Sequence, residues 1–268
     1  MSNINEITSL YHSEEGYELA KQELLPLIKE YATHEQSRIL EIGCSFGRNL
    51  VALASLPNAD ITGCDIDTKL LSQAQKRLQE KGITAVKLVH QTNERQLPFD
   101  GNSFDIIVTW QLLEHVMSPE EKKCILQEAA RVVKNNGIII IETPNQLFPI
   151  DYHDTNLPFI HWIFPDSWRE YFIRKIRKNK WPASQYTTIF QLKRFLKTSP
   201  GIQKIHSETK IYFQKSYQNI FKHWGGTRIG AKKIFFILYY PFYLLLRLLG
   251  LPGDTFTPSL RVVFRVNK

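Results

Sequence analysis

The stretch Ile39–Gly47, which reads ILEIGCSFG, decides the fold of this chain. An apolar strand with an acidic residue near its end leads into a turn bracketed by two glycines, and a helical pattern follows from Asn49. This order brings backbone N–H groups and a helix N-terminus beside a ligand. A second expected strand, residues 59–65, ends in Asp65, whose carboxylate suits the two hydroxyls of a ribose. Together the two strand ends predict a site for a nucleotide-like cofactor.

Two classes of cofactor compete for this geometry. A dinucleotide-binding turn expects the pattern G-x-G-x-x-G, and the matching positions here hold Gly43, Ser45 and Arg48. The third glycine normally lets helix and strand pack closely, and an arginine cannot replace it. With two of the three glycines absent, the sequence disfavours a dinucleotide.

The pattern E-x-G-x-S-x-G over residues 41–47 instead resembles motif I of the class I S-adenosylmethionine-dependent methyltransferases. The resemblance continues in register over roughly residues 36–145, and each piece lies at a fitting spacing. The further matching pieces are Asp65, residues 93–99 (NERQLPF), 103–108 (SFDIIV), 113–116 (LEHV) and 131–141 (RVVKNNGIIII).

The resemblance implies an α/β fold, with a Rossmann-like seven-stranded methyltransferase sheet, helices on both faces, and a helical cap from two insertions. The residues agree, because strand-like and helical segments alternate along the core. Expected strands lie near 38–42, 60–64, 85–89, 104–109 and 137–142, and expected helices near 47–55, 68–81 and 119–134. The last two strands, near 203–213 and 259–267, should form an antiparallel edge hairpin. Asp67 should cap one helix, and Thr188 should cap another at 189–198.

We expect four parts along the chain. They are an N-terminal helical cap (1–35), the cofactor-binding core (36–145), an acceptor-binding insertion (146–186), and a C-terminal part of the core (187–268) that contains an apolar insertion (214–258). The acceptor-binding insertion leaves the carboxyl ends of the strands directly. Because ligands bind at that edge, and loops there carry specificity, it should build the pocket of the methyl acceptor.

Eight residues are expected to bind S-adenosylmethionine, and they are Glu41, Gly43, Ser45, Gly47, Asp65, Asn93, Glu94 and Gln111. The glycines admit close approach of the backbone, and Glu41 would hold the ammonium group, directly or through water. Asn93 stands where the family usually has aspartate, and its amide oxygen still accepts from adenine, less strongly than a carboxylate. Gln111 either touches the methionine end or the acceptor, or only starts a helix that faces solvent.

Methyl transfer needs positioning more than acid–base help, because the sulfonium leaving group is already good. A general base is needed only if the acceptor must lose a proton. The candidates are His153, Asp151 and His161, which follow the fifth strand. A lone histidine in a loop is more often a structural hydrogen-bonding group, and His115 is expected to be one. No metal site is expected, since the three cysteines lack metal-ligand spacing.

The charge differs between the two halves of the chain. Residues 1–150 carry 14 Lys/Arg against 20 Asp/Glu, a net charge of −6, and residues 151–268 carry 20 against 6, a net charge of +14. The acidic half suits a sulfonium cation, and the basic half suits an anionic partner or is a solvated basic face. The sequence begins with polar residues, so no signal peptide is expected. The cysteines indicate a reducing, cytoplasmic location.

An apolar run at 234–251 holds 18 residues and one charge. Its length permits a short membrane span, but the strand expected after it must pair with the core sheet. An anchor lying in the membrane surface therefore fits better, and a buried helix pair is the alternative. The basic, partly apolar stretch 169–180 also suits an anionic membrane. No RNA-binding motif accompanies it, which disfavours a nucleic-acid partner.

The sequence thus predicts S-adenosylmethionine-dependent methylation of a small or lipid-linked acceptor, at oxygen, by a cytoplasmic protein peripheral on the inner face of the membrane. The resemblance is to the small-molecule branch of the family, which includes ubiquinone and menaquinone enzymes. Two alternatives stay open. One is an RNA methyltransferase that uses the basic half, and the other is a membrane-docked cofactor-binding protein without catalysis.

Overall fold

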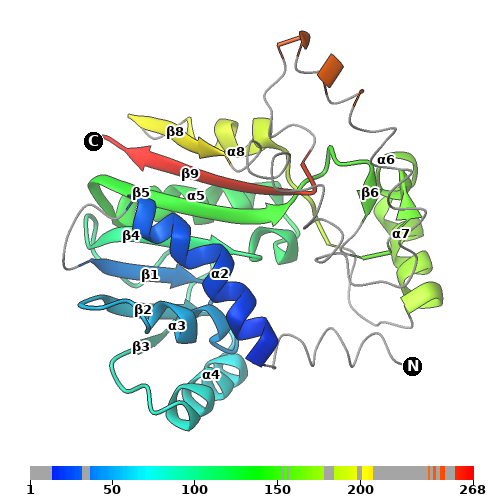
Figure 1. Ribbon diagram of the computed structural model, residues 1–268. Helices are drawn as coiled ribbons and strands as arrows, with labels where there is room; N and C mark the ends of the chain where they lie inside the picture. The colour runs from blue at the N-terminus through cyan, green and yellow to red at the C-terminus, as the bar shows by residue number, and fades with distance from the viewer. Residues whose placement is uncertain are drawn as a thin grey trace.

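The chain forms one twisted seven-stranded sheet with helices on both faces (Figure 1). The computed structural model describes residues 14–31, 37–151, 154–155, 157–177, 184–197, 201–207, 241, 244–245, 248–250 and 257–268. The strands run in the order β3-β2-β1-β4-β5-β9-β8. Their bounds are β1 Arg38–Ile42, β2 Asp60–Asp65, β3 Lys87–His90, β4 Phe104–Trp110, β5 Val133–Pro144, β8 Ile202–Ser207 and β9 Ser259–Val266.

Strands β1 to β5 pair in parallel, and β9 pairs antiparallel with both β5 and β8. This arrangement confirms the expected Rossmann-like sheet with an antiparallel edge. The central strands are buried as almost continuous apolar runs, as parallel strands covered on both faces must be. Ile106, Ile107 and Val108 of β4, for example, are all at most 1% exposed.

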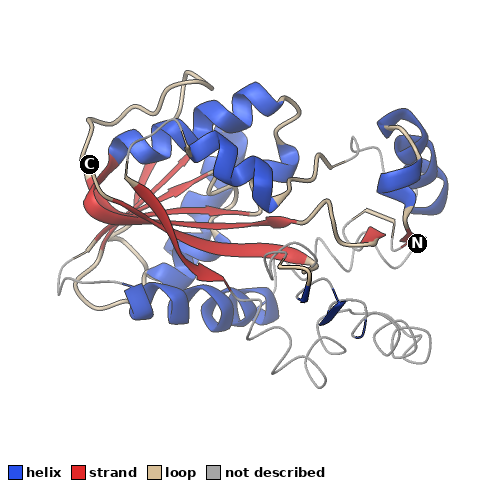
Figure 2. Ribbon diagram, turned by 90° about the horizontal axis from the view of Figure 1, so that it is seen from above, coloured by secondary structure: helices blue, strands red, loops and turns tan. Residues whose placement is uncertain are grey.

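Two layers of helices cover the sheet (Figure 2). On one face Leu24, Leu50 and Leu78 pack in a single apolar cluster, and they come from α2 Glu14–Tyr31, α3 Arg48–Leu53 and α4 Thr68–Glu80. On the other face Leu126 and Leu192 share a second cluster, and they come from α5 Pro119–Val132 and α8 Ile189–Leu196. The sheet therefore lies between two separate cores.

Both predicted helix caps are present. Asp67 Oδ1 accepts the backbone N–H of Lys69 at 2.7 Å and of Leu70 at 3.3 Å at the start of α4. Thr188 and Gln191 form a reciprocal capping box at the start of α8, with Thr188 Oγ1 accepting from the Gln191 backbone at 3.0 Å. Capping uses only neighbours in sequence, so the residue types alone identify it.

Strand β5 is longer than predicted, because it runs from Val133 to Pro144 and not only over the expected residues 137–142. Its register against β4 shifts between Phe104 and Ile106. A Cβ at Gly137 would lie 2.8 Å from the Asp105 carbonyl oxygen. Only glycine allows this close approach of the two backbones, which is typical of an irregularity inside a sheet.

Between β5 and α8 the chain leaves the carboxyl edge of the sheet, and we call residues 145–187 the cap. Its elements are β6 Ile150–Asp151, β7 Leu157–Pro158, α6 Ile160–Ile163, α7 Asp166–Phe172 and the π-helical turn η2 Ile173–Arg177. An isolated bridge between Asn145 and Thr187 closes its base. The cap lies beyond the strand ends, to the right in Figure 1.

About half of the expected N-terminal cap, and most of the apolar insertion 214–258, lies outside the described residues. Helix α2 is the described part of the former. Of the apolar run 234–251, residues 241, 244–245 and 248–250 are described. Within the described ranges, no helix is long and apolar enough to cross a membrane.

Candidate cofactor site and the adjoining cap

The carboxyl ends of β1 and β4 meet where the strand order reverses. From β1 the chain passes to β2 on one side, and β4 lies on the other side. In an open parallel sheet such a switch point is where ligands bind. Gly43 and Gln111 directly follow these two strand ends.

The turn after β1 depends on glycine at two places. Gly43 has φ 71° and Gly47 has φ 78°, both in the left-handed region. A Cβ at Gly43 would lie 2.5 Å from Leu112 Cδ1, and one at Gly47 would lie 3.0 Å from Ala74 Cβ. Any larger residue would meet both backbone strain and a contact. The turn therefore keeps bare backbone at the switch point, where a ligand can approach closely.

Asp65 joins the ends of β1 and β2. Its Oδ2 accepts the backbone N–H of Ser45 at 2.7 Å, and its Oδ1 accepts that of Asp67 at 3.0 Å. A carboxylate offers about four acceptor positions, so two remain for the two hydroxyls of a ribose. The side chain is held in place before any ligand arrives.

Glu41 is a buried carboxyl group beside this turn, 1% exposed. Its Oε1 accepts from Asn49 Nδ2 at 2.6 Å, whereas its Oε2 has no hydrogen-bond partner within the described residues. Burial raises the pKa of Glu41 to about 8, and the Asn49 hydrogen bond opposes this only in part. An ammonium group nearby would satisfy the orphaned oxygen and restore the charge. The residues present thus fit a cofactor that carries an ammonium and a ribose.

Arg48 and Glu142, which were not among the predicted site residues, also lie at the switch point. Arg48 Nη2 donates to Gln111 Oε1 at 3.2 Å, so α3 is tied across to the end of β4. The Gln111 backbone, at φ 54°, donates to the Glu142 carbonyl at 3.0 Å. Glu142 is buried beside Arg261 in the sheet register, and burial raises its pKa to about 8 although Arg261 opposes the shift. Half-buried Gln111 is therefore held on two sides and is not a free helix start.

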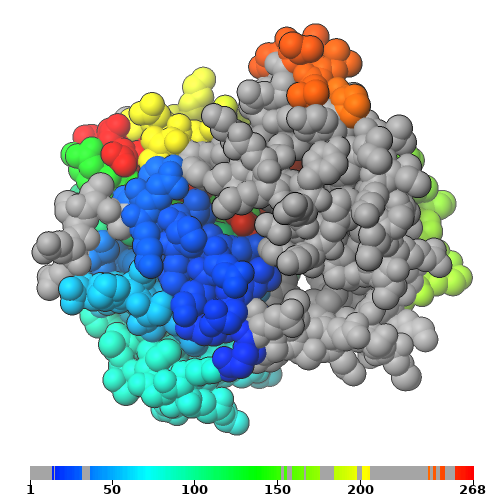
Figure 3. Space-filling view, in the orientation of Figure 1, coloured from blue at the N-terminus to red at the C-terminus, as the bar shows by residue number. Residues whose placement is uncertain are grey.

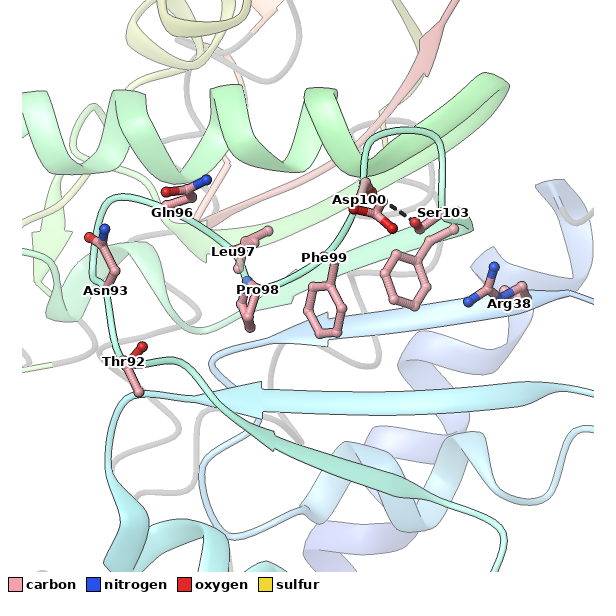
Figure 4. Close-up of a pocket in the computed structure, with 10 residues that line it drawn as sticks. Arg38, Thr92, Asn93, Gln96, Leu97, Pro98, Phe99, Asp100 and Ser103 are labelled. Atoms are coloured by element: carbon pink, nitrogen blue, oxygen red, sulfur yellow. Dashed lines mark hydrogen bonds between the residues drawn. The ribbon is translucent and has the colours of Figure 1, made fainter.

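The expected adenine loop is less constrained. Asn93 and Glu94 are exposed, and Asn93 Oδ1 accepts from the backbone of Arg95 at 2.9 Å within its own turn. A surface groove of about 520 Å³ runs along this loop, with Asn93 at one end and Arg38 at the other (Figure 4). Because Arg38 begins β1, the groove extends away from the switch point. The adenine contacts of Asn93 and Glu94 remain predictions.

Comparison with known proteins agrees with this geometry. Residues 39–137 match the family model described as a methyltransferase domain. This part of the chain is a class I S-adenosylmethionine-dependent methyltransferase domain. Its cofactor is S-adenosylmethionine, and the glycine turn, Asp65 and Glu41 fit that molecule.

The relatives of the methyltransferase domain cover part of the chain. A phosphatidylethanolamine N-methyltransferase of Cereibacter sphaeroides is 31% identical over 104 residues, 39% of this chain and 49% of that protein. A ubiquinone biosynthesis O-methyltransferase of Photobacterium profundum is 27% identical over 54% of this chain and 62% of its own length. The chain spans about half the length of the curated relatives that it matches first. The crystal structure of an S-adenosylmethionine-dependent methyltransferase from Clostridium acetobutylicum aligns over 99% of both chains, with a TM-score of 0.61 at 10% identity, and so shares the fold.

Asp151 is fully buried in the cap. Its carboxylate accepts from the hydroxyl of Tyr186, from Thr155 Oγ1 at 2.9 Å and from the backbone of Asp154 at 3.0 Å. Burial, and next the charge of Asp151, raise the pKa of Tyr186 well above its usual value, so the phenol keeps its proton. This geometry favours a structural role for Asp151, and its role as a general base remains a prediction. His153 lies outside the described residues.

His161 is buried in the cap at 9% exposure. Its Nε2 faces the Gln146 carbonyl at 3.0 Å, so Nε2 carries the hydrogen in the neutral ring. Its Nδ1 has no hydrogen-bond partner within the described residues. Burial lowers the pKa of His161, and Asp151 opposes this only in part, so the ring is neutral at pH 7. A neutral imidazole with an unused lone pair retains the property that a base requires, and His161 stays a candidate.

A buried ion pair, together with its hydrogen bonds to Ser184, joins the beginning, middle and end of the cap. Arg169 Nη2 lies 3.1 Å from Asp154 Oδ2, and both side chains are less than a tenth exposed. Asp154 also accepts from the backbone and the hydroxyl of Ser184, each at 2.9 Å, and Arg169 donates to the Ser184 carbonyl at 3.0 Å. Both charges of the pair thus have further hydrogen-bond partners inside the cap, as a buried charge pair needs.

Lys122 fastens the cap to the methyltransferase core. Its buried Nζ donates to the carbonyl of Gln185 and, at 3.1 Å, to Thr187 Oγ1. Burial lowers the pKa of Lys122 to about 8, and Glu114 opposes the shift. Glu114, in the short helix η1 Leu113–His115, accepts the Gln185 backbone N–H on its carbonyl at 2.8 Å. The last residues of the cap are thus held by α5 and by η1.

Proposed function

We propose that this protein transfers the methyl group of S-adenosylmethionine to a small or lipid-linked acceptor, and that it does so at oxygen. The observation that carries the proposal is the switch-point site, where two backbone N–H groups fix the Asp65 carboxylate and Glu41 Oε2 has no hydrogen-bond partner within the described residues. The cofactor supplies an electrophilic methyl group on a good leaving group. The residues around it bind, orient and exclude water.

The roles follow from the positions of the side chains. Asp65 holds the ribose hydroxyls, Glu41 receives the ammonium, and the turn with Gly43 and Gly47 lies against the cofactor. Gln111, fixed by Arg48, faces the methionine end or the acceptor. The cap supplies the acceptor pocket. His161, with Asp151 and His153 as alternatives, takes the proton if the acceptor is a hydroxyl group.

The names of two relatives support a lipid-linked acceptor. One is named for phosphatidylethanolamine, which is a membrane lipid, and the other for ubiquinone biosynthesis and O-methylation. The two matches cover 39% and 54% of this chain, so the acceptor of this chain has to be measured.

A membrane-surface location supports the same proposal. Among the described residues of the apolar insertion, Leu244, Leu245, Leu248 and Leu249 are exposed, with Leu248 at 84%. Exposed leucines in a chain half with a net charge of +14 suit a helix that lies in an anionic bilayer surface. We therefore place the protein in the cytoplasm, peripheral on the inner face of the membrane.

Titration calorimetry with S-adenosylhomocysteine tests the cofactor site. We expect Asp65→Ala to weaken binding by about 1–3 kcal/mol, because it removes charged hydrogen bonds to the ribose. Asp60→Ala is the matched control, since that carboxylate pairs with Lys87 at the opposite end of β2. Equal affinity in the Asp65 variant and in wild type would refute the ribose assignment.

Transfer itself is tested with S-adenosylmethionine labelled in the methyl group. Membrane extracts and quinone precursors serve as acceptors, and labelled products are identified by mass spectrometry. Label in a lipid or quinone fraction supports the proposal. Binding of S-adenosylhomocysteine without transfer to any of these acceptors would favour the non-catalytic alternative.

A further inference from the structure

The outer face of α7 presents large aromatic side chains to solvent. Trp168 is 56% exposed and Tyr171 is 53% exposed, whereas Arg169 is 3% exposed and Ile173, which directly follows α7, is also 3% exposed. Positions 168, 171 and 175 are three and four residues apart, so they share one side of the helical segment. A surface helix ordinarily turns its apolar side chains inward. We call Trp168, Tyr171 and Lys175 the aromatic stripe.

The side chains around the stripe extend its apolar character. Ile163, in α6, is 67% exposed and Trp162 is 45% exposed. The Trp168 ring stacks on Phe164, with centroids 5.7 Å apart and an interplanar angle of 13°. The Trp168 ring is therefore held in a fixed orientation. Exposed apolar groups gathered on one element mark a contact surface more often than a single exposed residue does.

Cations accompany these rings. Lys175 Nζ donates to the Tyr171 hydroxyl at 2.8 Å and lies 5.2 Å from its ring centroid. Arg174, next to Lys175 in the chain, is exposed, and its Nη2 lies 3.8 Å from Glu170 Oε2. Trp and Tyr rings with Lys and Arg beside them are the composition that proteins use at the boundary between lipid and water.

We propose that the aromatic stripe docks on the surface of an anionic lipid bilayer. The inference deepens the membrane part of the proposed function and rests on it. Positive charge complements anionic headgroups, and the rings enter the layer beneath them. Helices α6 and α7 lie beyond the carboxyl edge of the sheet and reach the outer surface of the molecule (Figures 1 and 3). Docking there would hold the cap, which is the proposed acceptor pocket, against the lipid that carries the acceptor.

Cosedimentation with vesicles tests the inference with the full-length protein. Phosphatidylcholine vesicles are compared with vesicles that also contain phosphatidylserine, both at low salt. We expect wild type to bind the anionic vesicles. Trp168→Ser with Tyr171→Ser should reduce partitioning at least about tenfold, and Lys175→Glu should reduce it roughly tenfold and in a salt-dependent way.

The chain offers matched controls on α8. Phe190 is 47% exposed, so Phe190→Ser removes an exposed aromatic ring elsewhere. Lys193→Glu reverses an exposed charge on the same helix. Both control variants should bind anionic vesicles as wild type does. If the stripe variants also bind like wild type, the docking proposal is overturned.

Calorimetry with S-adenosylhomocysteine on the same preparations separates the two proposals. Unchanged cofactor binding in a stripe variant shows that its lost sedimentation is not caused by misfolding. A wild type that binds S-adenosylhomocysteine but ignores anionic vesicles overturns docking and leaves methyl transfer standing. A wild type that sediments with anionic vesicles but does not bind S-adenosylhomocysteine refutes the cofactor site and leaves docking supported.

Discussion

The switch-point edge of the sheet and the cap beside it hold their polar groups in different ways. At the switch point the backbone provides most of the interactions. Gly43 and Gly47 adopt left-handed conformations, and two backbone N–H groups donate to the Asp65 carboxylate. In the cap, side chains far apart in sequence hold one another, as Asp151 and Tyr186 do. The first region therefore depends mainly on the backbone of its turns, and the second depends on pairs of side chains within the cap.

The cap should therefore be the more fragile region, and Asp154→Ala gives the largest expected effect. Without the carboxylate, Arg169 stays buried beside an unmatched site, and such losses cost about 3–5 kcal/mol. Chemical denaturation should show the lower free energy of unfolding, and limited proteolysis should show faster cleavage within the cap. Binding of S-adenosylhomocysteine should persist, since Ser184 and Tyr186, which contact this pair, belong to the cap.

Glu170→Ala is the matched control for that experiment. It removes the exposed pair with Arg174, which has an N···O distance of 3.8 Å, and exposed pairs contribute about 0.3–0.5 kcal/mol. If the two variants lose equal stability, the buried pair is not what holds the cap.

The switch point should respond to backbone changes instead. In Gly43→Ala the new methyl group meets Leu112 at 2.5 Å in addition to the strain of φ 71°. We expect about tenfold or greater loss of affinity for S-adenosylhomocysteine, which corresponds to about 1.4 kcal/mol. Gly82→Ala carries the strain alone, because φ is 68° and no atom lies within 4 Å of the added Cβ. It should cost about 1 kcal/mol of stability and leave cofactor affinity unchanged.

The smallest expected effect is a proton released when the cofactor binds. Glu41 has a folded pKa of about 8 against an ordinary value of 4.5. The free protein therefore holds this proton at pH 7, and the cofactor ammonium would favour its loss. Calorimetry at pH 7 in buffers of different ionisation enthalpy should detect up to one released proton. Glu41→Gln should abolish the release, and Glu142→Gln, the control, should preserve it.

The same pKa sets how stability depends on pH. The folded state binds the Glu41 proton more tightly than the unfolded chain, so this group contributes most below pH 4.5. Its contribution falls as pH rises from 4.5 to about 8 and is constant above that. In Glu41→Gln this part of the pH dependence should be absent. An unchanged pH profile of unfolding would show that Glu41 titrates normally.

The sequence predicted those features that depend on neighbours in the chain. The strands, the glycine turn, and the caps at Asp67 and Thr188 are all local, and the structure contains them. The extension of β5 was missed, because it depends on pairing with β4. The close backbone approach that requires Gly137 also exists only once the two strands pair. Arg48 was noted only because it stands where a dinucleotide-binding turn has its third glycine. Its contact with Gln111 could not be predicted, since the two residues are 63 positions apart.

The cap was the part that the sequence described least well. Nothing near Asp151 indicates that Tyr186, 35 residues later, will occupy its carboxylate. A carboxylate in a loop after a strand has the same local pattern whether it acts on a substrate or supports the fold. Its partners distinguish the two roles, and the partners are set by tertiary packing.

The closed base of the cap has a consequence for the family's evolution. Asn145 and Thr187 lie side by side, and Lys122 holds the chain next to them. The two ends of the cap are therefore fixed to the core next to each other, whatever the number of residues between them. Since lengthening such a loop costs little free energy, segments of other sizes and sequences can be exchanged between these points. We expect a transplanted cap to change the choice of acceptor while the host keeps its affinity for the cofactor.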